Sequence, residues 1–249
     1  MELRPFRCLR FSPAVLSERG LDALIAPPRG ENPGAAPENI ARITLANGAA
    51  AAETLARWLS EGILMKERRP GLWIYRQTSG GEEQPAILSL LVGIVRVAGS
   101  KNGIELPEEP PPPQTREARL AFRRETKADF EPCLLSTRAP LSGALATTRS
   151  PDLSATDARG VRHDAFRIGD FAQHVQLQGL VKNAQAALVW GSDLYEAARA
   201  FADDAAAAKL SGARFKLCAI GEESALASAA RVPEMYSGLF AVSLEDPVY

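Results

Sequence analysis

The segment Gly191-Ser192-Asp193 could hold an anion, because it directly precedes a stretch with helical patterning that begins at Leu194. The first turn of a helix presents unpaired N–H groups and the positive end of the helix dipole, which together bind phosphate. Asp193 favours a simpler role, since a carboxylate there would cap the helix, with Glu196 at the third helical position, and would repel a phosphate. Two interpretations follow: a phosphate site at Gly191 and Ser192, or a plain helix cap.

Basic side chains recur on one face of a helix that the sequence predicts over residues 117–130. Their spacing of three and four residues places them on the same side: Arg116, Arg119, Arg123 and Lys127. Guanidinium groups match phosphate and carboxylate oxygens with two parallel hydrogen bonds, so Arg119 is a candidate phosphate ligand. The alternative is a solvated helix face that is balanced by Glu117 and Glu125.

Glu108 is the candidate for acid–base chemistry. A general base needs a fixed position and a pKa that is tuned by burial or by a partner. The neighbours of Glu108 are Glu109 and the four prolines 110–113, a composition that favours a stiff, solvated polyproline segment over 108–114. The proline run could also be a ligand for an aromatic groove.

Histidine and cysteine give no pattern that would hold a metal ion. With two histidines, a histidine-rich site is excluded by counting, and the three cysteines show no metal-ligand spacing. The cysteines lie far apart, which is typical of reduced, buried thiols in the cytosol: Cys8, Cys133 and Cys218. His163 lies in an alternating strand, which favours a neutral structural histidine. The sequence contains no Walker loop, dinucleotide fingerprint or nucleophile elbow.

These residues must be positioned by alternating strands and helices. Patterning predicts strands over 4–11, 23–26, 39–46, 72–78, 86–98, 133–136, 163–168, 186–190, 215–220 and 239–244. It predicts helices over 49–61, 117–130, 173–182, 194–209 and 222–230. The alternation indicates an α/β (mixed α+β) fold, with a mixed sheet and flanking helices. We expect one compact unit over 1–249, or two lobes split at a linker over 141–159.

Composition limits the function classes. The chain has 249 residues, of which 46% are hydrophobic, enough to bury a sizeable core. Its 29 basic and 30 acidic side chains give a net charge of -1, which disfavours general binding to nucleic acid or to a membrane surface. The N-terminus lacks a signal-peptide pattern, and the apolar run 86–97 is shorter than the roughly 20 residues of a spanning helix. We therefore expect a cytoplasmic protein.

Several segments resemble a bacterial family called domain of unknown function 1015. Arg4-Pro5-Phe6-Arg7 is similar to its opening strand, and Ile25-Ala26-Pro27-Pro28 to the first half of its Ala-Pro-Pro-Tyr-Asp signature. The most specific likeness is a helix-then-strand segment, residues 58–64 followed by 72–77. Gly160-Val161-Arg162-His163 and the stretch 191–197 match later motifs. The resemblance covers nearly the whole chain and implies that the C-terminal portion of the family is missing.

The polar motifs of that family are mostly replaced. Pro27-Pro28-Arg29-Gly30 stands in place of Pro-Pro-Tyr-Asp, and Pro107-Glu108-Glu109-Pro110 in place of His-Glu-x-Thr. Trp190-Gly191-Ser192-Asp193-Leu194-Tyr195 stands in place of Asp-Gly-His-His-Arg-Tyr, a turn that resembles the ParB/sulfiredoxin superfamily. That superfamily includes free-serine kinases, so the resemblance implies that an intact member would be a small-molecule phosphotransferase.

The selective loss of acid, base and cation positions predicts a non-catalytic member with a degenerate site and no cofactor, whose role is binding, regulation or assembly. Its partner would be a small molecule or a protein. The alternative is a diverged kinase of a small hydroxylated, serine-like metabolite that uses ATP or ADP with Mg. In that case Glu108 would act as base, and Arg119, Gly191 and Ser192 would bind phosphate.

Two further expectations concern partners. Nucleic-acid binding by analogy with ParB-like folds is disfavoured by the neutral charge of the chain. A missing C-terminal portion would expose a sheet edge or an apolar face near 239–249, and such edges are usually paired or covered. A homodimer through this edge is therefore predicted.

Overall fold

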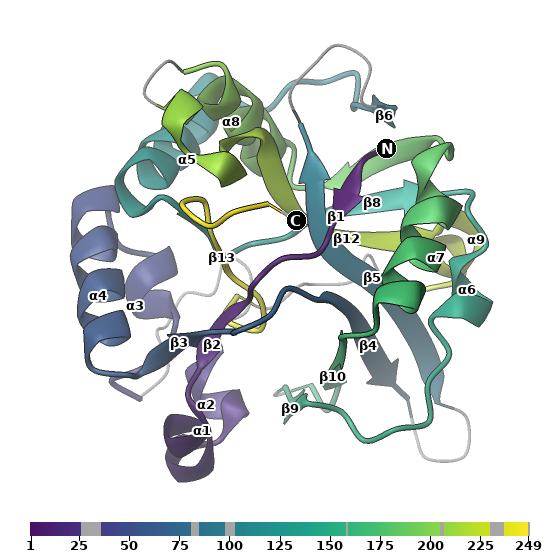
Figure 1. Cartoon of the computed structure of the whole chain (residues 1–249), viewed down its shortest axis with the longest axis horizontal. Coiled ribbons are helices and arrows are strands. Elements are labelled where there is room, and N and C mark those ends of the chain that lie inside the picture. The colour runs from purple at the N-terminus through teal and green to yellow at the C-terminus, as the bar shows by residue number, and fades with distance from the viewer. Residues whose placement is uncertain are drawn as a thin grey trace.

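The computed structural model describes residues 1–25, 36–80, 85–97, 103–157, 159–204, 207–229 and 237–248. In these residues a nine-stranded mixed sheet runs in the order β6-β11-β8-β12-β5-β4-β10-β9, with β1 paired to β5 (Figure 1). The strands are β1 (Leu3–Arg4), β4 (Leu72–Ser79), β5 (Ala86–Arg96), β6 (Ile104–Glu105), β8 (Cys133–Thr137), β9 (Leu153–Thr156), β10 (Arg162–Ile168), β11 (Ala186–Trp190) and β12 (Phe215–Glu222). The predicted mixed α/β fold is confirmed, and its ParB/sulfiredoxin-like detail stays a prediction.

The centre of the sheet is the β4–β5 hairpin that the sequence predicts. These strands are antiparallel, β12 pairs antiparallel with β5, and β8 pairs parallel with β12. Side chains of β4 alternate between the two faces because successive residues of a strand point to opposite sides. Trp73 and Tyr75 pack into one hydrophobic core, whereas Leu72 and Ile74 pack into the other.

Helices cover both faces of the sheet. They are α1 (Pro13–Arg19), α2 (Leu21–Leu24), α3 (Ala41–Thr44), α4 (Gly48–Ser60), α5 (Pro113–Thr126), α6 (Leu141–Ala144), α7 (Phe171–Lys182), α8 (Ser192–Ala202) and α9 (Glu223–Ser228), with 3-10 turns η1 (Ala207–Lys209) and η2 (Ser211–Arg214). Residues of α3 and α4 belong to one hydrophobic core, against which α9 also packs, and residues of α6, α7 and α8 belong to the other. None of these described helices is long and apolar enough to cross a bilayer.

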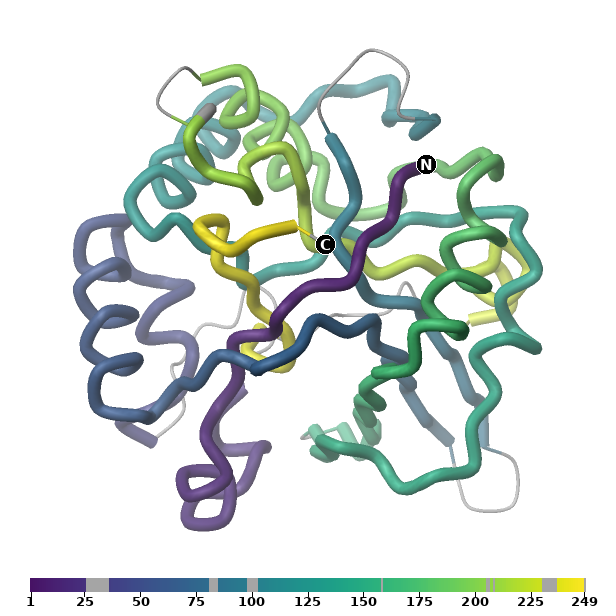
Figure 2. The backbone as a smooth tube through the Cα atoms, viewed as in Figure 1, coloured from purple at the N-terminus to yellow at the C-terminus, as the bar shows by residue number. Residues whose placement is uncertain are grey.

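Two short sheets contain strands from the N-terminal and C-terminal segments. β2 (Leu9–Phe11) pairs with β3 (Leu64–Lys66), and β13 (Val242–Ser243) pairs with β7 (Ala128–Asp129). Figure 2 shows the N-terminal and C-terminal segments running across the middle of the molecule. Residues 239–242 and Leu244 are buried, so the described part of 239–249 offers no exposed apolar face. The predicted homodimer stays a prediction.

Three predicted segments were wrong. The strand predicted over 23–26 is helical at Ala23 and Leu24, and the strand predicted over 39–46 contains α3; Ala26 lies outside the described residues. Short apolar runs do not distinguish a buried strand from a buried helical turn. The linker predicted over 141–159 contains α6 and the edge strand β9, which pairs with β10.

Other helix boundaries shifted. The polyproline segment ends at Pro112, and α5 begins at Pro113, because proline fits the first turn of a helix, where its missing N–H has no intrahelical partner. The helix predicted over 194–209 ends at Ala202. The helix predicted over 49–61 is confirmed as α4, which Asn47 caps by accepting from the Ala50 N–H.

Candidate functional site

Helix α5 meets the start of α8 through Arg119. Its Nε donates to Asp193 Oδ2 at 3.3 Å, and its Nη1 donates to Glu131 Oε2 at 2.7 Å. Arg119 and Asp193 are 74 positions apart in the sequence. The fold thus brings the predicted phosphate ligand Arg119 to the predicted anion-binding turn at Gly191 and Ser192.

The start of α8 depends on Gly191, which has a left-handed conformation with φ of 87°. Such a conformation is strained for residues with a Cβ, and a Cβ here would lie 3.2 Å from Cys133 Sγ. Gly191 is the N-cap, and no side chain caps the helix. The prediction that Asp193 caps α8 was wrong, because its carboxylate lies in the first turn and pairs with Arg119, while Glu196 pairs with Arg199.

A second cluster of charges lies beneath Arg119. Asp129 accepts from Lys216 Nζ at 2.6 Å, from Arg123 Nη1 at 2.9 Å and from the Leu217 N–H at 3.1 Å. Lys216 also donates to the Glu131 carbonyl. Asp129, Lys216 and Arg123 are only 6%, 1% and 5% exposed. Buried charges at this depth need partners, and each of these has one.

The electrostatics of the cluster keep its central pair ionised. Burial by itself would raise the pKa of Asp129, but the charges of Lys216 and Arg123 outweigh it and hold the pKa below its ordinary value. Burial would lower the pKa of Lys216, but Asp129 together with Cys133 and Cys218 outweighs it and raises the pKa. For Glu131, burial outweighs Arg119 and Lys216, so the pKa of this carboxyl is raised.

Two cavities adjoin the cluster. An open groove of about 620 Å³ lies between α4 and α5, and its lining includes Asn47, Gln114 and Arg119. An inner cavity of about 30 Å³ reaches Asp129 and Lys216, and shares Thr44, Arg119 and Phe122 with the groove. The inner cavity has room for about one or two water molecules. A larger ligand could therefore occupy only the groove.

Glu108, the predicted base, is not part of this site. It is exposed on the segment between β6 and α5, lines neither cavity, and forms no hydrogen bond or ion pair with the described residues. The predicted solvated face balanced by Glu117 and Glu125 was also wrong for Arg119 and Arg123. Their partners are carboxylates from outside α5, because that side of the helix packs against the body of the protein.

Sequence reasoning missed the residues that fill the site, Asp129, Glu131 and Lys216. One signal was present: Lys216 interrupts the apolar run from Phe215 to Ile220. A lysine in such a strand requires a carboxylate nearby. The two acidic residues flank Phe130, with Asp129 at the end of β7 and Glu131 in the connection to β8, and the sequence gives no indication of their partners.

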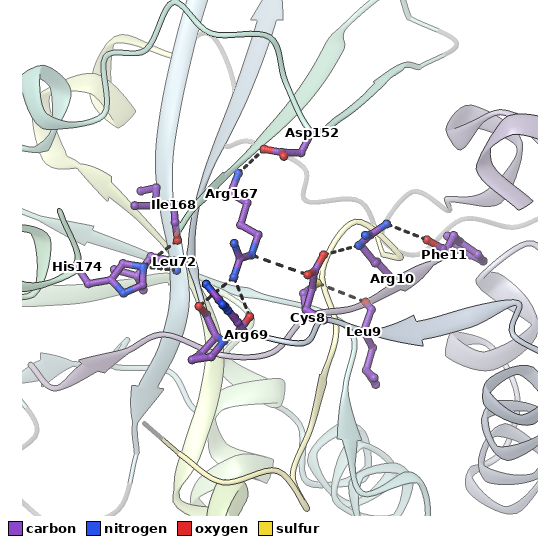
Figure 3. Close-up of polar contacts among 12 residues, drawn as sticks. Cys8, Leu9, Arg10, Phe11, Arg69, Leu72, Asp152, Arg167, Ile168 and His174 are labelled. Atoms are coloured by element: carbon purple, nitrogen blue, oxygen red, sulfur yellow. Dashed lines mark hydrogen bonds and ion pairs between the residues drawn. The ribbon is translucent and has the colours of Figure 1, made fainter. Parts of the chain in front are cut away.

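The histidines have structural surroundings. His163 is fully buried, its Nδ1 lies 2.6 Å from the Tyr75 hydroxyl, and its Nε2 lies 3.4 Å from Asp157 Oδ2. Burial lowers its pKa, which favours the neutral, hydrogen-bonded histidine that the sequence predicts. The ring of His174 contacts the backbone of Ile168 and Leu72 (Figure 3).

The cysteines are also structural, since all three are buried as predicted. Burial raises the pKa of the Cys8 thiol to about 12. No group of side chains in the described ranges could hold a metal ion.

The fold and the site together define a class of protein. It is a mixed α/β protein with helices on both faces of its sheet, and it has a buried cluster of ion pairs beside the start of a helix. The family model "Protein of unknown function (DUF1015)" matches residues 3–220, and the chain belongs to this family. The family resemblance of the sequence motifs is thereby confirmed. No curated protein and no solved structure matches the chain.

Proposed function

We propose that this chain is a non-catalytic member of its family, a cytoplasmic protein with a binding, regulatory or assembly role. One observation carries the proposal. Among the described residues, every cation close to the Gly191 turn forms an ion pair with a carboxylate. Arg119 pairs with Glu131 and Asp193, and Lys216 and Arg123 share Asp129. Three cations and three carboxylates leave no net positive charge for a phosphate.

A nucleotide phosphate at this turn would meet an unfavourable field. It would have to displace two carboxylates from Arg119, and it would lie close to Asp193 in the first turn of α8. Two like unit charges about 4 Å apart near a protein surface repel by about 4 kcal/mol. Gly191 and Asp193 are buried and Ser192 is half-buried, and in such partly buried geometry the dipole of one helix contributes at most about 2 kcal/mol. Repulsion therefore exceeds the attraction of the helix start.

The acid–base part of a kinase mechanism also lacks support. A positioned base contributes about 10²–10⁴ in rate, and it must reach the proton that it removes. Glu108 is exposed and has no partner among the described residues that would fix it. A site that has neither a positioned base nor a cation free to bind phosphate should catalyse little phosphoryl transfer.

The alternative is a diverged kinase of a small hydroxylated metabolite, with ATP or ADP and Mg. One observation favours it: Arg119 does lie beside the Gly191 turn, as a phosphate ligand would have to. In this proposal, Arg119 would exchange Glu131 and Asp193 for a nucleotide phosphate, and Glu108 would have to approach the groove.

Calorimetric titration with ADP and with ATP, each with Mg, separates the two proposals. We expect no binding heat for the native chain, and no phosphate transfer to serine. The variant Glu131→Gln/Asp193→Asn releases Arg119 from both carboxylates, so it should gain measurable affinity for ADP. Tight ADP binding by the native chain that Arg119→Ala abolishes would overturn the non-catalytic proposal and support the kinase.

A further inference from the structure

Basic side chains gather where the N-terminal segment runs beside β3 and the connection from β3 to β4. We call them the basic patch, and its members are Arg7, Arg10, Lys66, Arg68, Arg69 and Arg167. The carboxylates that pair with them are Glu67 and Asp246. Asp152, nearby, is balanced by Arg149. Six cations against two carboxylates leave four excess positive charges among the described residues, on a chain whose net charge is -1.

The pairs within the patch do not use all of its cations. Arg10 pairs with Glu67, while Arg7 and Lys66 share Asp246. Arg68 and Arg69 are exposed, and neither forms an ion pair with any residue that the structure describes. These two guanidinium groups are therefore accessible to an anionic partner.

The backbone that carries Arg68 and Arg69 is fixed at both ends. The Glu67 N–H donates to the Cys8 carbonyl at 2.9 Å. Gly71 exchanges two hydrogen bonds with Phe6, at 3.0 and 3.1 Å. Arg167 Nη2 also donates to the carbonyls of Arg69 and Pro70, at 2.8 and 3.1 Å (Figure 3). The connection is thus held as a short, pinned projection.

The Arg167 side chain can reach this connection because Gly71 and Gly169, which lie against it, have no Cβ. A Cβ at Gly71 would lie 2.9 Å from the Ile168 carbonyl oxygen and 3.2 Å from Arg167 Nε. A Cβ at Gly169 would lie 2.9 Å from Arg167 Nη1. A pinned backbone loses less conformational entropy when its side chains bind a partner. The fold therefore presents two arginines in a preorganised arrangement.

We propose that the basic patch docks an acidic segment of a partner protein. Guanidinium groups bind carboxylates through two parallel hydrogen bonds, and a local excess of charge increases the association rate. The patch has four excess positive charges and the whole chain has a net charge of -1, so the rest of the chain has five excess negative charges. That remainder repels a long polyanion such as nucleic acid, whereas a short acidic segment meets only the patch. This surface is separate from the Gly191 turn, and the proposal does not depend on the function proposed above.

Fluorescence anisotropy with a labelled octaglutamate peptide tests the proposal, with octaglutamine as the neutral peptide. We expect the native chain to bind octaglutamate at low ionic strength, and to bind it more weakly as salt screens the charges. Arg68→Glu/Arg69→Glu should weaken binding by about tenfold or more. Arg68→Gln/Arg69→Gln, which introduces no carboxylates, should weaken it in the same direction.

The matched control is Arg138→Glu/Lys182→Glu, which changes the net charge equally at exposed positions outside the patch. It should change the affinity by less than about twofold. The proposal is overturned if octaglutamate does not bind at low ionic strength, or if the control weakens binding as much as the patch variants. Tighter binding of oligouridine than of octaglutamate would overturn it in favour of a nucleic-acid surface. Circular dichroism of each variant checks that it is folded.

Discussion

The substitution Asp129→Asn removes the charge at the centre of the buried cluster and keeps the size of the side chain. The native carboxylate accepts from Lys216 and Arg123, which are 1% and 5% exposed. In the variant, two cations would remain side by side in the interior without the carboxylate that they share. The adjoining cavity of about 30 Å³ has room for only one or two water molecules, which carry no net charge and could solvate the two cations only in part.

The expected cost follows from this geometry. Removing one partner of a buried ion pair costs about 3–5 kcal/mol. Because Asp129 serves two buried cations, we expect a loss near the upper limit, about 4–5 kcal/mol. The free energy of unfolding of a domain is typically about 5–15 kcal/mol. At this chain length the loss corresponds to a fall of roughly 8–20 °C in Tm.

Urea unfolding followed by tryptophan fluorescence measures the loss, because Trp58 and Trp73 are buried in the native chain. Asp246→Asn is the matched control. Asp246 also bridges two cations, Arg7 and Lys66, but these keep 25% and 35% of their side-chain surface exposed. We expect the control to cost about 1 kcal/mol. Equal losses in the two variants, or a loss below about 1 kcal/mol for Asp129→Asn, would refute the reasoning.

Two further predictions concern pH and the start of α8. The lowered pKa of Asp129 means that its contribution to stability is complete above its unfolded-state pKa of about 3.9, and is lost as the pH falls through the folded value. The difference in unfolding free energy between the native chain and Asp129→Asn should therefore stay constant above about pH 4 and shrink below it, as urea titrations at several pH values would show. Gly191→Ala should destabilise by about 1–2 kcal/mol for the left-handed backbone, plus the cost of the close contact with Cys133. Gly62→Ala is the control, because Gly62 has a φ of 70° and open space around it, and it should lose stability only through the left-handed backbone. Equal falls in Tm for Gly191→Ala and Gly62→Ala would contradict the prediction.

The sequence predicted those elements whose patterning is long and regular. Helix α4 and the β4–β5 hairpin have many residues that agree on one period, so each was predicted nearly to its ends. Helices α2 and α3 have four residues each, and Leu24 and Ile43 are fully buried through packing with distant segments. Such short elements are determined by tertiary contacts, which no local pattern contains.

Strand β9 shows a different limit. Its residues Leu153 and Ala155 are buried and Ser154 and Thr156 are exposed, so the alternation was present in the sequence. The surrounding Ser, Thr and Asp residues are typical of loops and obscured it. The strand exists because it pairs with β10, a partner that could be identified only from the fold.

For the candidate site, the sequence identified Arg119 and the Gly191 turn, and the fold brings them together. It could not supply the pairing of charges, because Glu131 lies 12 positions from Arg119, beyond the end of α5, and Lys216 lies 87 positions from its partner Asp129. Asp193 was identified as a carboxylate that opposes phosphate, which agrees with its pairing, but its geometry as a helix cap was wrong. Residue types thus indicated the chemistry, and the pairing of charges required coordinates.

The most direct measurement of whether the Gly191 turn can hold a nucleotide is a crystal structure of the native chain soaked with ADP and Mg. We predict that Arg119 keeps its bonds to Glu131 and Asp193, and that no phosphate lies against the backbone amides of Ser192 and Asp193. Phosphates bound at those amides, with Arg119 turned towards them, would contradict the proposal that this site is non-catalytic.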